Sequence, residues 1–255
     1  MRFYLGTHKA VWLERLDVPL FISRRTLEGR KSLPRARAGW ALDSGGFTEL
    51  HGGGRWSISA AEYAAQVDRY AAEIGRLEWV APMDWMCEPS VRAQTGLSVA
   101  EHQARTVANF GELRDLLGPL VIPVVQGWTL AEFTECVARY YHAGHELHRE
   151  PVVGVGSICR RGQTLEICRV VRTLQRLFDL RMHGFGVRGE ALHALGDVLT
   201  SADSMAWSYA ARRSPPLRAC THARCSNCPR YAMRWRDRLL AGVQPRLFDH
   251  EGVPT

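Results

Sequence analysis

Four short apolar runs in this chain each end in polar or glycine residues, and a fifth run late in the chain repeats the pattern. They are Ala41–Phe47, Ala81–Asp84, Pro123–Gly127, Val153–Ser157 and Ser201–Trp207. Runs of this kind are typical of buried parallel strands that carry a polar side chain or bare backbone at one end. Because active sites in α/β barrels are built from the carboxyl ends of several strands, the pattern constrains both the fold and the place of a site.

Apolar runs bounded by turn residues predict eight strands. They are Arg2–Gly6, Pro19–Ser23, Gly39–Ser44, Leu77–Asp84, Leu120–Gly127, Val152–Ser157, Met182–Val187 and Ser201–Trp207. Helical patterns separate the later strands, at 59–74, 98–117, 129–143, 164–178 and 188–195. The first four of these helices begin at Ser or Thr, the residues that cap helices well.

This alternation predicts an α/β fold, a TIM-like (β/α)8 barrel. Only about a dozen residues separate the first two strands, so we predict an irregular N-terminal hairpin at the bottom of the barrel. A doubly wound open sheet is the alternative fold. We expect a catalytic domain over 1–214, a zinc-binding segment with a helix over 215–244, and a loose tail over 245–255. No apolar stretch reaches the ~18 residues of a membrane span, and no signal peptide is recognisable, so we expect a cytoplasmic protein.

The predicted strand ends carry groups that suit a flat ligand rich in hydrogen bonds. Asp43 and Asp84 supply carboxylates, Gln126 supplies an amide, and Gly127 and Gly156-Ser157 supply backbone that a ligand can approach closely. A carboxylate matches the N1–H and amine of guanine. Phe47, Trp85, Trp128 and Trp207 follow the same strand ends, and we expect at least one to stack on a base, although core packing is the alternative for each.

The chain has 33 Lys+Arg against 26 Asp+Glu, a formal charge of +7, which favours a polyanionic partner. Almost all the positive charge is arginine, a preference that a GC-rich genome also produces. Arginines follow several predicted strands, and we expect them to bind phosphates around the barrel mouth; a solvated charged rim is the alternative. They are Arg24, Arg25, Arg160, Arg161, Arg188, Arg212 and Arg213.

Four metal-binding side chains lie within nine residues near the end of the chain. They are Cys220, His222, Cys225 and Cys228. Three thiols and an imidazole at this spacing match tetrahedral Zn²⁺ in a reducing compartment better than a disulfide framework. Because four ligands leave no open position, we predict a structural zinc site. His222 is the least secure ligand, since it can instead face nucleic acid.

Together these motifs resemble the tRNA-guanine transglycosylase superfamily, whose members exchange guanine for a 7-deazaguanine base. Asp43-Ser44-Gly-Gly-Phe47 is similar to the family's Asp-Ser-Gly-Gly-Phe motif, and Val125-Gln126-Gly127 to its Val-Gln-Gly. The resemblance implies that Asp203 is the nucleophile and Asp43 the general acid/base. It further implies that Asp84, Gln126, Gly127, Gly156, Ser157, Ser44 and Phe47 bind the base.

Three departures make the chain look more like the compact branch of phages and genomic islands that inserts 7-deazaguanines such as preQ0 into DNA. The Pro-Thr-Arg after the family's nucleophile is replaced by Met205-Ala-Trp207-Ser, the cysteine spacing differs, and the chain is shorter than the tRNA enzymes. The resemblance therefore implies a pentosyltransferase acting on DNA, in a bacterial cell or a phage-infected host. The alternatives are the same chemistry on tRNA, a non-catalytic zinc-containing nucleic-acid-binding module, and a barrel hydrolase of a small ligand. The oligomeric state stays open.

Overall fold

The computed structural model describes residues 1–158, 164–187 and 189–242. Eight parallel strands form one curled sheet in the order β4-β3-β2-β1-β8-β7-β6-β5. They are β1 (Arg2–Thr7), β2 (Leu20–Ser23), β3 (Trp40–Asp43), β4 (Leu77–Val80), β5 (Val124–Val125), β6 (Val153–Val155), β7 (Met182–Gly184) and β8 (Ser201–Ser204). Each lies within or overlaps a strand that the sequence predicts. The α/β class and the eight strands are thereby confirmed.

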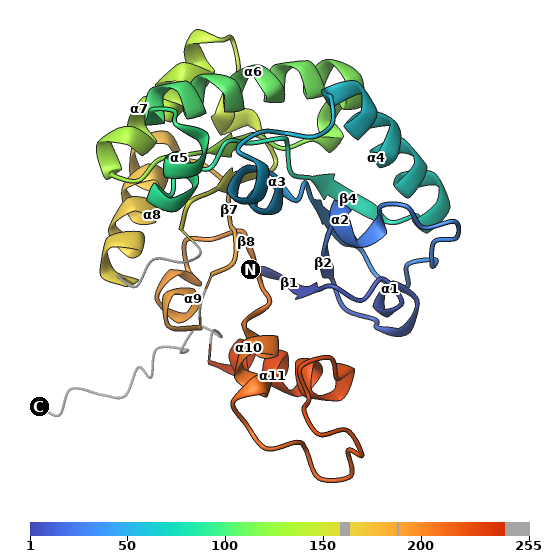
Figure 1. The fold of residues 1–255 in the computed structure, drawn as a ribbon. Helices are drawn as coiled ribbons and strands as arrows, with labels where there is room; N and C mark the ends of the chain where they lie inside the picture. The colour runs from blue at the N-terminus through green and yellow to red at the C-terminus, as the bar shows by residue number, and fades with distance from the viewer. Residues whose placement is uncertain (159–163, 188, 243–255) are drawn as a thin grey trace, which may run out of the picture.

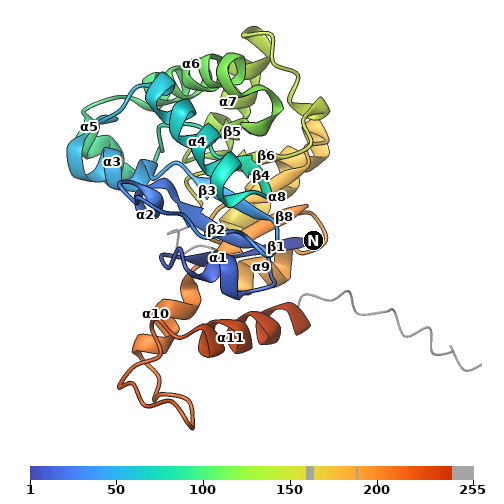
Figure 2. The same cartoon turned by 90° about the vertical axis from the view of Figure 1, so that its right-hand side faces the viewer.

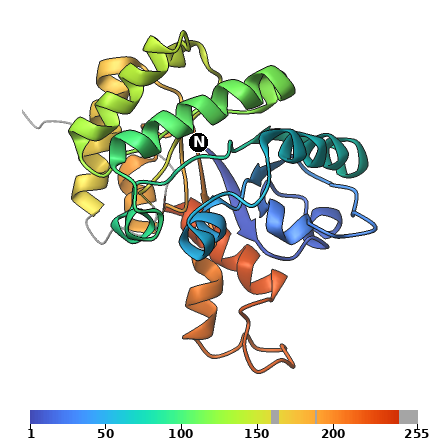
Figure 3. The same ribbon diagram turned by 45° about the horizontal axis from the view of Figure 1, so that its top comes forward.

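The helices are α1 (Trp12–Arg15), α2 (Arg24–Leu27), α3 (Gly46–Gly53), α4 (Ala60–Ile74), α5 (Pro89–Thr95), α6 (Val99–Leu117), α7 (Leu130–His142), α8 (Thr164–Phe178), α9 (Gly189–Leu195), α10 (Ala206–Arg212) and α11 (Pro229–Ala241), with short 3-10 turns η1 (Gly118–Leu120) and η2 (Leu147–Arg149). The longer helices cover the outer face of the curl, whereas α3 and α5 pack together at the carboxyl ends of the strands and α10 and α11 lie at one end of the molecule. Figure 1 and Figure 3 show α4, α6, α7 and α8 as an arc around the strands. No helix in the described ranges is long and apolar enough to cross a membrane.

The two outer strands, β4 and β5, approach each other without forming a ladder. In the part of the chain that the structure describes, they are joined by one isolated parallel bridge between Val80 and Val121, where the Ile122 amide donates to the Val80 carbonyl at 3.1 Å. The sheet is therefore a curled half-barrel. Closure into a complete barrel stays a prediction.

The predicted N-terminal hairpin is wrong. β1 pairs with β2 in parallel, with Leu5 opposite Leu20, and pairs with β8 on its other side. A hairpin requires antiparallel strands, whereas a parallel pair needs a crossover of about a dozen residues. The connection between Thr7 and Leu20 has about this length, and it forms the crossover through the short helix α1, which buries Trp12 and Leu13.

Capping boxes define the starts of three long helices. Ser59, Ser98 and Thr129 each accept a hydrogen bond from the backbone three residues later, where a glutamate reaches back to the cap. This reciprocal pair satisfies amides that would otherwise lack a partner at the first turn, and it typically contributes about 1 kcal/mol. The predicted starts of α4, α6 and α7 are confirmed.

Alternation along the strands separates two apolar layers. Leu5, Ile22 and Leu42 belong to the large outer core beneath the helices. Tyr4, Ala41, Trp79 and Ile122 form a second cluster, with Phe21 and Phe185 packed against it. Because side chains two apart share a face, residues two positions after the inner cluster also turn inward. Asp43, two residues after Ala41, follows this rule.

Candidate functional site

Three carboxylates from distant parts of the chain line one cavity of about 300 Å³. Asp43 is the last residue of β3, Asp203 lies in β8, and Asp84 follows β4 by four residues. The same cavity is lined by Gln126, Gly156 and Ser157 from the ends of β5 and β6. The strand ends that the sequence singles out thus meet at one place.

The turn after β3 holds Asp43 in position. Gly45 adopts φ +82°, a left-handed conformation that glycine reaches without strain, and α3 starts at the next residue. The Gly45 amide and the Ser23 hydroxyl both donate to the Asp43 carboxylate. Burial nevertheless raises the pKa of Asp43, and the negative charge of Asp203 adds to the rise. A raised pKa makes a carboxyl group more ready to hold and donate a proton, as a general acid must.

Asp203 is held through one of its two oxygens. The Gly186 amide donates to Oδ1 at 2.9 Å, and Nε2 of His183 lies 3.4 Å from the same atom. Nδ1 of His183 lies 2.9 Å from the Ser201 hydroxyl. Among the described residues both polar contacts of this carboxylate go to Oδ1, so Oδ2 is the oxygen available to a ligand.

His183 is a site residue that sequence reasoning missed. It is fully buried, and the register of β7 and β8 sets it opposite Ser201, two residues before Asp203. A buried imidazole beside a carboxylate orients that carboxylate. The only sign in the sequence was a single histidine in an apolar strand. Its place beside Asp203 becomes visible only once β8 is known to pair with β7.

On the wall of the cavity opposite Asp203, Gln126 links Asp84 to Ser157 through hydrogen bonds. Its amide NH₂ donates to the Asp84 carboxylate, and its amide oxygen accepts from the Ser157 hydroxyl at 2.6 Å. A β-carbon at Gly156 would overlap the Gln126 amide, so a larger residue there would displace this amide from its contacts with Asp84 and Ser157. Ser157 itself adopts φ +54°, which is unusual for a residue with a side chain and typical of functional sites.

Burial raises the pKa of Asp84 to about 7, and the charge of Asp43 contributes to the rise, while the Gln126 hydrogen bond opposes it. A fourth carboxylate, Glu88, also lines the cavity; its Oε2 lies 2.8 Å from the Ser157 hydroxyl. Sequence reasoning missed Glu88 because it follows no strand directly.

Not every predicted base-binding residue lines the cavity. Phe47 does. Ser44 and Gly127 do not. Ser44 is buried, and its carbonyl accepts a hydrogen bond from Nε of Arg24 at 3.2 Å. A β-carbon at Gly127 would lie 2.7 Å from the Phe133 amide nitrogen, so this glycine allows close packing against α7.

The aromatic walls also differ from the expectation. Trp207 is fully buried, packs on Trp12 and donates to the Gly6 carbonyl, so it belongs to the core. Trp85 is 6% exposed and does not line the cavity, and neither does Trp128. Phe21 and Phe185 line it instead, with ring centroids 5.9 Å apart.

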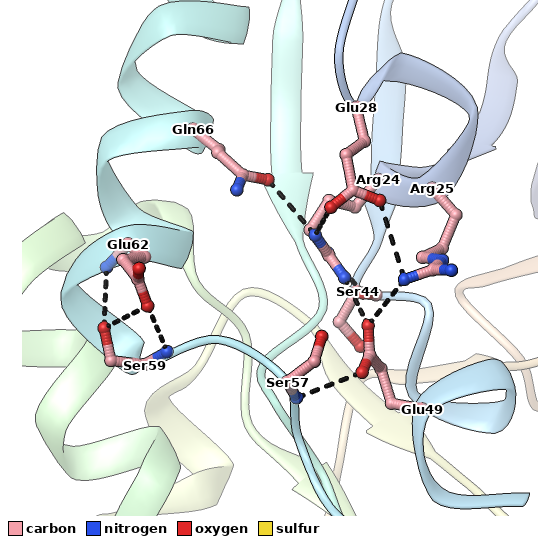
Figure 4. Close-up of polar contacts among 9 residues, drawn as sticks. All are labelled: Arg24, Arg25, Glu28, Ser44, Glu49, Ser57, Ser59, Glu62 and Gln66. Carbon is pink, nitrogen blue, oxygen red and sulfur yellow. Dashed lines mark hydrogen bonds and ion pairs between the residues drawn. The ribbon is translucent and has the colours of Figure 1, made fainter. Parts of the chain in front are cut away.

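Arg24 is not a phosphate-binding residue, and the expectation for it was wrong. Its side chain is completely buried and donates to Glu49 at 2.6 Å, to Glu28 at 3.1 Å and to the Ser44 carbonyl (Figure 4). A buried guanidinium needs such partners because an unpaired buried charge costs several kcal/mol. Arg24 therefore ties α2 to the turn that carries Asp43.

Three of the other predicted arginines lie among the described residues. Arg25 is exposed and also contacts Glu49, at 3.0 Å. Arg212 and Arg213 are exposed at the end of α10, where the Arg213 guanidinium lies 3.5 Å from the centroid of the Tyr209 ring. Arg160, Arg161 and Arg188 lie outside the described residues, as does the predicted tail over 245–255.

The predicted metal ligands come together between α10 and α11. Ligand atoms of Cys220, His222, Cys225 and Cys228 all lie within 4.8 Å of one another. The sulfurs of Cys220 and Cys228 are 4.0 Å apart, close to the ~3.8 Å edge of a tetrahedron with 2.3 Å metal–sulfur bonds. Three thiols and an imidazole at these distances fit one metal ion.

A family model described as "DpdA: DeoxyPurine in DNA protein A" matches residues 1–252 of the chain. The matched range contains every carboxylate of the cavity and the whole Cys/His cluster. No curated protein matches the chain.

Proposed function

The chain belongs to the DpdA family, DeoxyPurine in DNA protein A, and from this premise we propose that it exchanges guanine in DNA for a 7-deazaguanine base such as preQ0. The observation that carries the proposal is the convergence of Asp43, Asp84 and Asp203 on one cavity. Its volume of about 300 Å³ is at the lower end of the range for small-molecule sites, which suits a single base. The reaction class is pentosyl transfer.

In the proposed reaction Asp203 is the nucleophile of a double displacement. Oδ2 forms a bond to C1′ as the bond from C1′ to N9 of guanine breaks, and the departing base takes the electron pair. The contacts of Oδ1 with Gly186 and His183 hold the carboxylate in place for this attack. The resulting sugar ester divides one difficult step into two easier ones, as in retaining glycosidases.

Asp43 would move the proton. Its raised pKa allows it to donate to the departing guanine and then to remove the proton from N9 of the incoming base. That base attacks C1′ and releases the Asp203 carboxylate, so the cycle leaves both groups as they began. A 7-deazaguanine is a poorer leaving group than guanine, which makes the exchange hard to reverse.

The opposite wall would hold each base in turn. An ionised Asp84 accepts from the N1–H and amine of a guanine-like base, and Gln126 with the backbone of Gly156-Ser157 reads the remaining edge. Phe21, Phe47 and Phe185 line the cavity with apolar surface on which a base can pack.

We propose Zn²⁺ as the ion of the Cys/His cluster, on the donor set of three thiolates and one imidazole. When bound, zinc would cross-link the loop between α10 and α11 and supply stability rather than a reacting group. Cys225 and Cys228 are buried in the outer core, which supports a structural role.

The exchange is tested by incubating the protein with labelled preQ0 and either duplex DNA or tRNA, followed by nucleoside digestion and mass spectrometry. We expect label in deoxynucleosides. Label in tRNA alone would move the substrate to the alternative branch. Tight, salt-sensitive nucleic-acid binding without label in either would favour the non-catalytic module.

The affinity for the incoming base should depend on pH through Asp84. Because the pKa of this carboxyl is raised to about 7, it is protonated below pH 7 and cannot accept from both donors of the base. We expect affinity for preQ0 to rise between pH 6 and pH 8, with about a tenfold change per pH unit below the pKa. Isothermal titration calorimetry across this range measures it.

Asp84→Asn is the matched control, because the amide keeps the shape and removes the titration. It should bind preQ0 more weakly, and with no pH step near 7. The stability of the protein should change with pH in the opposite direction to the affinity. Because the ionised Asp84 carboxyl is disfavoured in the fold, the free energy of unfolding of the wild type should decrease as the pH rises from about 4 to 7. A wild-type affinity that is flat from pH 6 to pH 8 would remove Asp84 as the base reader.

A further inference from the structure

The excess positive charge of this protein is concentrated in one segment, residues 206–242. This segment contains eight arginines, no lysine and one aspartate, a formal surplus of seven. That surplus equals the +7 of the whole chain, so the remaining residues carry equal numbers of basic and acidic groups. The single carboxylate, Asp237, already pairs with Arg236 at 3.2 Å.

Three of these arginines surround one hollow. Arg218, Arg230 and Arg234, together with Pro216 and Leu217, line a cavity of about 560 Å³. Arg230 and Arg234 are four residues apart on α11 and so share a face of the helix. A hydrogen bond from Arg230 to the Ala219 carbonyl, at 3.4 Å, ties the helix to the metal loop, the loop over residues 213–228 that carries the Cys/His cluster.

The three guanidinium groups are exposed, and among the described residues none of them forms an ion pair with a carboxylate. The arginines elsewhere behave differently: Arg24, Arg114 and Arg172 each bind a glutamate or aspartate. Three like charges around one hollow repel each other, and an anion bound between them would offset this repulsion. Planar guanidinium groups bind phosphate oxygens through paired hydrogen bonds.

The arginine segment adjoins the cavity of the carboxylates. Met205 lines that cavity and is the residue directly before α10. His8, from the loop after β1, also lines it and lies 2.6 Å from Asn227 of the metal loop. Ser208 of α10 donates to the carbonyl of Ser226 in the same loop. Figure 2 shows α10 and α11 together at one end of the molecule, below α1 and α9.

We propose that Arg218, Arg230 and Arg234 form a phosphate seat for the DNA backbone beside the nucleotide that enters the carboxylate cavity. The proposal rests on the proposed function for its choice of polyanion, and it assigns the backbone contact to the metal-binding segment instead of the arginine doublets at the strand ends. Because backbone contacts position DNA without reading its sequence, the seat would hold any duplex in register.

The test compares the triple variant Arg218→Ala/Arg230→Ala/Arg234→Ala with the wild type in fluorescence-anisotropy titrations of labelled duplex DNA at several salt concentrations. Each phosphate contact contributes about 0.9 to the slope of log affinity against log salt. We expect the slope to fall by about 2 to 3 and the affinity at 0.1 M salt to fall about 100-fold. Affinity for free preQ0 should not change.

Two further variants distinguish loss of the phosphate seat from a general loss of positive charge and from misfolding. Arg15→Ala/Arg149→Ala/Arg172→Ala removes three exposed arginines on other elements and should leave the salt slope within about 1 of the wild type. Arg218→Lys/Arg230→Lys/Arg234→Lys keeps the charge and loses the paired hydrogen bonds, so it should restore the salt slope and only part of the affinity. Equal losses in the two alanine triples would overturn the seat, and so would a seat triple that binds like the wild type. If the wild type exchanges base in DNA in either case, the proposed function stands while the seat fails.

Discussion

Asp203→Asn should abolish base exchange, with a loss of about 10⁴-fold or more in kcat/KM. The amide cannot form the ester with C1′, while its oxygen can still accept from the Gly186 amide, so the local structure should survive. The measurement is single-turnover exchange with labelled preQ0 and duplex DNA. A denaturing gel run in parallel should show a protein–DNA adduct for the wild type and none for the variant.

The matched control for this substitution is Asp197→Asn, an exposed aspartate that pairs with Arg172 at 2.9 Å. It should exchange base at the wild-type rate and form the adduct. Affinity of Asp203→Asn for preQ0 should remain within about threefold of the wild type, because in the proposed site Asp84 and Gln126, on the opposite wall of the cavity, would still hold the base. An Asp203→Asn variant with full activity, or one that still forms the adduct, would remove this residue as the nucleophile.

Loss of the metal is the second large effect that we expect. Cys228→Ser removes a buried thiol of the Cys/His cluster at the start of α11, and the structural zinc that we propose there would supply on the order of 10 kcal/mol to the fold of the segment that it cross-links. The variant should contain less than stoichiometric zinc by mass spectrometry of the metal. Amide hydrogen exchange should show lost protection between Arg213 and Arg230.

The same variant should lose DNA affinity while it keeps its affinity for preQ0. Arg218 and Arg230 flank the metal loop, whereas the carboxylate cavity is built from the strands. Cys168→Ser is the control, since this half-buried thiol on α8 lies outside the cluster and should change neither metal content nor binding. Stoichiometric zinc together with unchanged protection in Cys228→Ser would exclude this cysteine as a ligand.

The strands could be predicted because their signal is local. A parallel strand buried on both faces, such as Trp40–Asp43, begins as a continuous apolar run, and Asp43 with the glycines that follow marks where it ends. The starts of α4, α6 and α7 were predictable for the same reason, since a capping box involves residues only three apart. The direction of β2 was not, because parallel and antiparallel partners produce the same run of residues.

The residues of the candidate site likewise divide into those with a local signal in the sequence and those whose place depends on tertiary contacts. Asp43, Asp84, Gln126, Gly156, Ser157 and Asp203 all line the cavity and were predictable because each lies within an apolar run that the sequence marks as a strand. Arg24 was misassigned because its partner Glu49 lies 25 positions away and gives no local sign of the pairing. His183 and Phe185 were missed because what an inward side chain touches depends on the adjacent strand.

The sequence by itself determined the eight strands, the starts of three long helices, the polar residues near the strand ends and the spacing of the Cys/His cluster, because hydrophobic period, capping and residue spacing are properties of neighbouring residues. The tertiary structure alone decided which charges are neutralised: Arg24 is buried against Glu49, while Arg218, Arg230 and Arg234 lie around one hollow without a carboxylate among the described residues. The physical reason is that a charge is paired or free according to what lies within a few ångströms, and the curl of the sheet sets those distances.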